Sequence, residues 1–174
     1  MGSVLIEKEL EFNFTSAIKA IHFDKEDHKM SHCMKAVDFL VEWPDEFWFA
    51  EVKDPAESKI PKKYKKQELQ NFLEKMKNEK LFSQELGPKL KDSFLYLHLS
   101  KKLPDKTLKY FVLLAIGTLD YALQATSIDH LKRYTCLLGP DNSEWPNQYI
   151  NAVAIFNEDT WNKKLNQCPV TRKN

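Results

Sequence analysis

The stretch KAVDFLVEWPDEFWFAEVK at residues 35–53 decides the fold. Two runs rich in β-branched and aromatic residues, at 35–43 and 47–53, flank a turn that begins at Pro44. Such runs are typical of strands, and a proline followed by acidic residues is typical of the turn between them. The stretch therefore predicts an antiparallel β-hairpin.

Three charged side chains can lie on one face of this hairpin. Successive side chains of a strand point to opposite faces, so Glu51 and Lys53 share a face of the second strand. A two-residue turn would pair Asp38 with Glu51, and a four-residue turn would pair it with Lys53. A three-residue turn would set Asp38 opposite Val52 and separate the three groups, unless a bulge intervenes. The first two registers both give a cluster of two carboxylates and one lysine.

The residue types in this cluster favour a metal site. Their neighbours FLVEW and FWFA are typical of buried strands, where a charged group is costly unless it pairs or coordinates something. Two neighbouring carboxylates repel, which either raises a pKa or favours a bound cation. Mg²⁺ prefers one or two carboxylates with waters and phosphate oxygens, and a lysine beside it can orient water or offset transition-state charge. Asp38, Glu51 and Lys53 therefore indicate phosphate chemistry with Mg²⁺ or Mn²⁺.

The sequence after the hairpin alternates helices with strands. Apolar residues recur every three or four positions over 61–80, which predicts an amphipathic helix with a basic start. The continuous apolar run at 107–117 predicts a strand buried on both faces. The remaining elements are helices at 82–101 and 120–133, a strand at 149–156, and a tail that begins as a helix and ends irregularly. This order predicts one α/β domain over 1–174, a mixed central sheet flanked by helices.

The sequence before the hairpin is less regular. Residues 4–14 fit either a strand or the first turn of a helix. Thr15 or Ser16 could cap a short helix through AIKAIHF, residues 17–23. The polar segment that follows predicts a loop, so we expect a helix and a loop to lead into the first hairpin strand.

The hairpin resembles the core of the PD-(D/E)XK, or restriction-endonuclease-like, nuclease superfamily. Asp38 on one strand and Glu51-Val52-Lys53 on the next are similar to the superfamily's Asp followed by Glu-x-Lys. In that superfamily the Asp and Glu hold Mg²⁺ and the Lys assists the attacking water. The resemblance therefore implies Asp38 and Glu51 as metal ligands, Lys53 as a catalytic residue and a restriction-endonuclease-like fold.

The resemblance also implies a polar residue on the helix after the hairpin, where the superfamily often places a Gln or Tyr facing the site. Tyr64, Gln67 and Gln70 occupy this helix, and Gln67 is the preferred catalytic candidate.

The chain departs from the superfamily pattern at two places. Val37 precedes the Asp where the superfamily has a proline. A Glu on the first helix, common in the superfamily, has three candidates here: Glu7, Glu9 and Glu11. The simpler interpretation of the motif is an exposed hairpin with an ordinary surface ion pair.

A basic run follows the hairpin and consists of Lys59, Lys62, Lys63, Lys65 and Lys66. One interpretation is a nucleic-acid-binding patch that contacts phosphates beside the metal site. The other is a solvated helix start. Charge runs are usually solvated, but lysines are unfavourable at a helix N-terminus, where the macrodipole is positive, so both interpretations stay open.

Composition excludes several classes of protein. The four glycines are scattered, which excludes a Walker loop and a dinucleotide fingerprint, and a GxSxG serine-hydrolase motif is absent. The formal net charge of +1 excludes a polyelectrolyte that binds nucleic acid over its whole surface. The three cysteines lack CxxC spacing, which disfavours a disulfide framework and a Cys-rich zinc site. His28 and His32 have a helical metal spacing, but their segment predicts a loop.

The sequence thus predicts metal-dependent hydrolysis of phosphodiester bonds in nucleic acid, with DNA as the expected partner. The alternative is a catalytically inactive nuclease-fold module that binds a nucleic-acid or protein partner. The N-terminal stretch is unlike a signal peptide and the longest apolar run is too short to span a membrane, so a cytoplasmic protein without a membrane partner is expected. The sequence leaves open whether the chain forms a homodimer.

Overall fold

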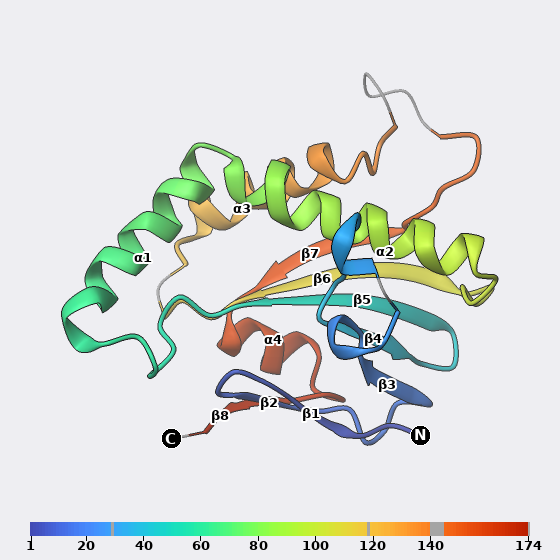
Figure 1. Ribbon diagram of the computed structural model, residues 1–174, viewed down its shortest axis with the longest axis horizontal. Coiled ribbons are helices and arrows are strands. Elements are labelled where there is room, and N and C mark those ends of the chain that lie inside the picture. Colours follow the sequence, from blue (N-terminus) through green and yellow to red (C-terminus); the bar gives the residue numbers. More distant parts are fainter. Residues whose placement is uncertain (29, 118, 140–144, 174) are drawn as a thin grey trace.

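The computed structural model describes residues 1–28, 30–117, 119–139 and 145–173. Figure 1 shows a five-stranded sheet with helices on both faces and a second, three-stranded sheet below it. Helices α2 (Gly87–Leu99) and α3 (Tyr121–Tyr134) lie over one face, with α1 (Lys62–Lys77) beside them, and α4 (Glu158–Lys164) lies between the two sheets. The prediction of a mixed α/β fold with helices flanking a central sheet is confirmed.

The five-stranded sheet has the order β3-β4-β5-β6-β7. The first two neighbouring pairs are antiparallel and the last two are parallel. The strands are β3 (Lys19–His22), β4 (Phe39–Glu42), β5 (Glu46–Lys53), β6 (Thr107–Leu114) and β7 (Ala152–Phe156).

Strands β4 and β5 form the predicted hairpin. The Trp43 N–H donates to the Glu46 carbonyl at 2.9 Å, which closes a two-residue turn. Phe39 pairs with Ala50 across the ladder. Continuing this register by one residue sets Asp38 opposite Glu51, so the two-residue alternative is the correct one.

The predicted short helix at 17–23 is wrong. Its central residues form β3, an edge strand that pairs with β4 from Lys19 opposite Glu42 to His22 opposite Phe39. Pairing with β4 satisfies the backbone groups of this segment and buries Ala20, and this tertiary contact overrides the local capping signal. The loop that follows contains two single 3₁₀ turns, η1 (Phe23–Lys25) and η2 (Met30–His32).

The chain ends build the second sheet, of order β1-β2-β8. Residues 4–14 supply the hairpin of β1 (Val4–Glu7) and β2 (Leu10–Asn13), which selects the strand alternative for that segment. The tail, predicted to end irregularly, instead pairs β8 (Val170–Arg172) with β2. An apolar layer between the two sheets, with Trp161 of α4 fully buried in it, accounts for this closure.

The predicted helix at 82–101 consists of two parts. A π-helix, η3 (Leu81–Leu86), passes directly into α2 at Gly87. A Cβ at Gly87 would lie 2.7 Å from the Tyr134 carbonyl oxygen, so only glycine permits this close approach to α3. π-helical turns occur often at functional sites, because the extra residue redirects the side chains on either side of it.

Strand β6 lies between β5 and β7 and is buried on both faces, as predicted. Tyr110, Val112 and Leu114 face the apolar layer under α2 and α3, whereas Phe111 and Leu113 face the layer around α4. Within the described residues, no helix is both long enough and apolar enough to cross a membrane.

Candidate functional site

Asp38 and Glu51 face the α2 side of the sheet, from the adjacent strands of the hairpin. Asp38 retains 4% of its accessible surface and Glu51 retains none. The Val52 N–H donates to Asp38 Oδ2 at 2.7 Å, which fixes the Asp38 carboxylate against β5. The prediction that these two carboxylates converge is therefore confirmed, in a setting far more buried than a surface ion pair.

A lysine that sequence reasoning missed lies between the two carboxylates. Lys89, in the first turns of α2, places its Nζ 3.1 Å from Asp38 Oδ1 and 2.7 Å from Glu51 Oε1. Contact with one nitrogen holds these two oxygens no more than about 6 Å apart, whereas two oxygens bound to one Mg²⁺ at ~2.1 Å per bond lie within ~4.2 Å of each other. The ammonium thus supplies the positive charge that the buried carboxylates need.

Lys53 completes the group on the solvent side. Its Nζ lies 3.1 Å from Glu51 Oε1 and 2.9 Å from Oε2 of Glu85, an acid contributed by the π-helix η3. Glu85 also contacts Lys75 of α1 at 3.3 Å. We call Asp38, Glu51, Lys53, Glu85 and Lys89 the carboxylate–lysine cluster. Only its lysines and Glu85 reach solvent, since the side chains of Lys53 and Lys89 are about one fifth exposed.

Burial and charge shift the ionisation of this cluster. Desolvation, together with the neighbouring Asp38 carboxylate, raises the pKa of Glu51 to about 7. Desolvation also raises the pKa of Asp38. For Lys89, desolvation acts to lower the pKa, but the charges of Glu51 and Asp38 outweigh it and hold the pKa above the usual value. Near neutral pH the Lys89 ammonium is therefore charged, while the Glu51 carboxyl is close to its pKa.

The donor set fits a magnesium or manganese ion. Among the described residues, Glu51 Oε2 is buried without a hydrogen-bond partner, and such an acceptor is costly unless something binds it. No group of three or more His, Cys, Asp or Glu side chains in the described ranges gathers closely enough to hold a metal by itself. Mg²⁺ does not need one, because it takes one or two carboxylates and keeps waters or phosphate oxygens as its other ligands.

Gln67, the preferred catalytic candidate on α1, does not take part in this cluster. Its side chain is exposed and donates to Asn71 Oδ1 at 2.8 Å on the same helix. Gln70 likewise donates to Glu74, and Tyr64 is half exposed. The next two helical segments, η3 and α2, supply the polar side chains of the site instead.

The three N-terminal glutamates lie in other contacts. Glu7 pairs with His22 at 2.9 Å, Glu9 accepts from the Ser58 N–H at 2.7 Å, and Glu11 pairs with Lys173. All three lie on or beside the second sheet, because their segment adopts the strand alternative.

The basic run surrounds the start of α1. Lys59 is exposed just before the helix, and the helix begins at Lys62 with Pro61 as its N-cap. The N-cap provides no side-chain hydrogen bond, and lysines fill the first turn, where acidic residues would match the helix dipole. Lys63, Lys65 and Lys66 follow with exposed or half-exposed side chains. This helix start is therefore locally basic, with no acidic residue in its first turn.

The chain matches no protein-family model, no curated protein and no solved structure.

Proposed function

We propose that this chain is a Mg²⁺- or Mn²⁺-dependent nuclease with a restriction-endonuclease-like core, and that it hydrolyses phosphodiester bonds of DNA. The observation that carries the proposal is the convergence of Asp38, Glu51 and Lys53 on one face of the β4–β5 hairpin, with both carboxylates on a single cation. A helical layer over that face and a parallel β6 beside β5 add support from the fold.

Asp38 and Glu51 are the side chains that would hold the metal, through Asp38 Oδ1 and the unpartnered Glu51 Oε2. A bound divalent cation would lower the pKa of its water and polarise the phosphate. In the reaction the water oxygen bonds to phosphorus, one ester P–O bond breaks, and the leaving oxygen takes a proton.

Lys53 is positioned to act on the substrate side of the site. Its ammonium reaches solvent while resting between Glu51 and Glu85, and these acids raise its pKa despite desolvation. It therefore stays charged and can offset the negative charge that develops on the phosphate oxygens. The lysines at the start of α1 would hold neighbouring phosphates through charge, without reading sequence.

The test combines calorimetric titration of Mn²⁺ with cleavage of supercoiled, linear and single-stranded DNA. Asp38→Asn should abolish cleavage and weaken the metal heat, because a neutral amide of the same shape is a poor Mg²⁺ ligand. Asp45→Asn, at the exposed hairpin turn, is the matched control and should cleave as the wild type does. Lys53→Ala should keep metal binding and slow cleavage by about 10²–10³-fold, as the loss of one electrostatic donor does.

A second function is favoured by one observation. The Lys89 ammonium already neutralises both carboxylates from inside the protein, as a permanent structural replacement for a metal would. Under this alternative the chain is a catalytically inactive module that binds a nucleic-acid or protein partner. If the wild-type protein gives no heat of metal binding and cleaves no DNA or RNA substrate, the second function replaces the first.

A further inference from the structure

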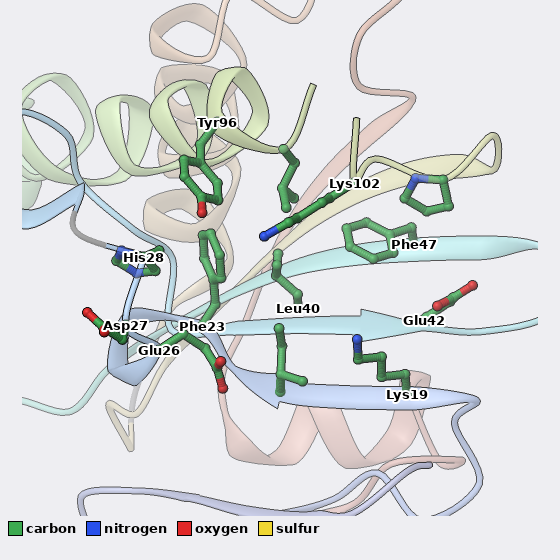
Figure 2. A pocket seen from close by; sticks show the side chains of 13 residues that line it. Lys19, Phe23, Glu26, Asp27, His28, Leu40, Glu42, Phe47, Tyr96 and Lys102 are labelled. Carbon is green, nitrogen blue, oxygen red and sulfur yellow. The ribbon is translucent and has the colours of Figure 1, made fainter. Parts of the chain in front are cut away.

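A cavity of about 590 Å³ opens on the same face of the sheet as the carboxylate–lysine cluster, under the C-terminal end of α2. We call it the α2 cavity. Its principal side chains come from η1, β3, β4, β5, the end of α2 and the segment after it (Figure 2): Lys19, Phe23, Leu40, Phe47, Tyr96 and Lys102. None of the site residues predicted from the sequence lies in it.

The walls of the α2 cavity suit a flat, partly apolar ring. Phe23, Phe47 and Tyr96 contribute three aromatic rings, and Leu40 forms part of the floor. In Figure 2 the ends of Tyr96 and Lys102 turn toward the Phe23 ring and Leu40. Aromatic and aliphatic surfaces of this kind bind nucleobases by stacking, which is favourable for every base because each has a π-face.

Two of the lining residues, Lys19 and Lys102, can contact an anion, while Glu26, Asp27 and Glu42 line the same cavity. Among the described residues, neither Lys19 nor Lys102 has a carboxylate within ion-pairing distance, whereas the cavity's Glu42 is already paired with Lys106 at 2.7 Å. Lys102 Nζ lies 5.7 Å from the centre of the Tyr96 ring. Apolar rings and unpaired ammonium groups thus stand side by side, as recognition of a phosphorylated aromatic ligand requires.

His28 provides an unpartnered donor at the opposite end of the cavity. Its Nδ1 accepts the Met30 N–H at 3.1 Å, which places the proton of the neutral ring on Nε2. In the described part of the chain, Nε2 is buried without a hydrogen-bond partner, in a wall shared with Phe23 and Tyr96. Glu26 and Asp27 lie beside it and can accept from the amino group of a base.

The cavity adjoins the proposed metal site. The Phe23 N–H donates to the Asp38 carbonyl at 2.7 Å, and Leu40 lies two residues after Asp38 on the same face, roughly 7 Å along the strand. Tyr96 follows Lys89 on α2 by about two turns, or roughly 10 Å. A short single-stranded segment can span these distances.

We propose that the α2 cavity binds one unstacked nucleotide of the substrate strand, with its base against the cavity-facing surfaces of Phe23, Tyr96 and Leu40 and its phosphate near Lys19 and Lys102. This inference deepens the proposed nuclease function and rests on it for the identity of the ligand. It assigns single-stranded or locally opened DNA as the substrate class, since a base inside a duplex cannot enter a cavity without leaving its stack.

The experiment is an NMR titration of ¹⁵N-labelled protein in EDTA with dAMP, deoxyadenosine or inorganic phosphate. Amide shifts around the α2 cavity are expected, and dAMP should bind at least about tenfold more tightly than phosphate, because stacking adds to the charge interaction. Tyr96→Ala and Lys102→Met should each weaken dAMP binding by about tenfold or more. Leu95→Ala and Lys91→Met are exposed controls on the same helix and should leave it unchanged.

The outcomes separate this proposal from the nuclease proposal. Binding of dAMP at the cavity without any metal-dependent cleavage would support the cavity as a nucleotide site and remove the nuclease function. Cleavage that persists unchanged in Tyr96→Ala, without dAMP binding at millimolar concentration, would overturn the cavity proposal alone. Equal affinity for phosphate and dAMP would also overturn it, because the site would then recognise an anion and no base.

Discussion

Replacing Lys89 by methionine removes the counter-ion of two buried carboxylates while it keeps most of the side-chain volume. Asp38 and Glu51 each lose a contact, of 3.1 and 2.7 Å respectively. Removing one partner of a buried ion pair costs ~3–5 kcal/mol. Because Lys53 still contacts Glu51 and Lys89 is partly exposed, we expect a loss of about 2–4 kcal/mol of unfolding free energy at pH 8.5.

The loss should depend on pH. The pKa of Glu51 is already raised to about 7 in the folded protein, and loss of the Lys89 charge raises it further. A carboxyl group with a raised folded-state pKa contributes stability that is full below its unfolded-state pKa and is lost as the pH rises through the folded value. At pH 5 the Glu51 carboxyl of Lys89→Met is protonated when folded, so the cost there should be clearly smaller than at pH 8.5.

Urea unfolding of Lys89→Met at pH 5 and pH 8.5 measures both effects, with Lys91→Met as the control on the exposed side of α2. Millimolar Mg²⁺ should restore stability to Lys89→Met at pH 8.5 and leave the control unchanged, since a divalent cation replaces the missing charge. A loss no larger than that of Lys91→Met at both pH values would refute the reasoning. It would mean that the two carboxylates do not depend on this ammonium.

Three further perturbations test other parts of the molecule. As the pH rises from 4.5 to 8.5, the unfolding free energy of Glu51→Gln should rise by on the order of 3 kcal/mol relative to that of the wild type, because the variant lacks the carboxyl whose folded-state pKa of about 7 exceeds its unfolded value. Parallel pH profiles of the two proteins in urea unfolding would contradict this. Desolvation lowers the pKa of His22, but hydrogen bonds to Asp24 and Glu7 outweigh it and raise the pKa to about 9. The destabilisation by His22→Gln should therefore be full below pH 6.5 and disappear as the pH rises through 9, with the ring titration followed by NMR. Leu113→Ala, at a fully buried position of β6, should cost ~2–5 kcal/mol in urea unfolding, and a loss under ~1 kcal/mol would contradict its core position.

The hairpin and its two carboxylates were predictable because their signals are local. Strand residues on both sides of Pro44, with period-two alternation, specify two strands and one turn. The length of the turn decides whether Asp38 lies opposite Glu51. The sequence left a two-residue and a four-residue turn as alternatives. The observed pairing of Phe39 with Ala50 selects the shorter turn.

The rest of the site depends on packing between distant segments. Lys89 meets Asp38 only because α2 crosses the hairpin at one particular rotation, which side-chain periodicity within α2 does not determine. The same rotation is set partly by the π-helical turn before Gly87, and no local pattern marks that turn. Gln67 lies outside the cluster for the same reason, since its exposed side chain donates to Asn71 on α1.

The lysine between the carboxylates follows from the burial of two acids in an apolar sheet. An uncompensated carboxylate pair is costly there, so the folded chain needs a cation whether or not a metal is present. The backbone N–H of Val52 donates to Asp38 and fixes its carboxylate. The Lys89 ammonium, in contrast, is carried by a flexible four-carbon side chain that is partly exposed to solvent. A divalent ion could therefore displace the ammonium without moving either strand. The hairpin would then keep the same geometry with and without metal.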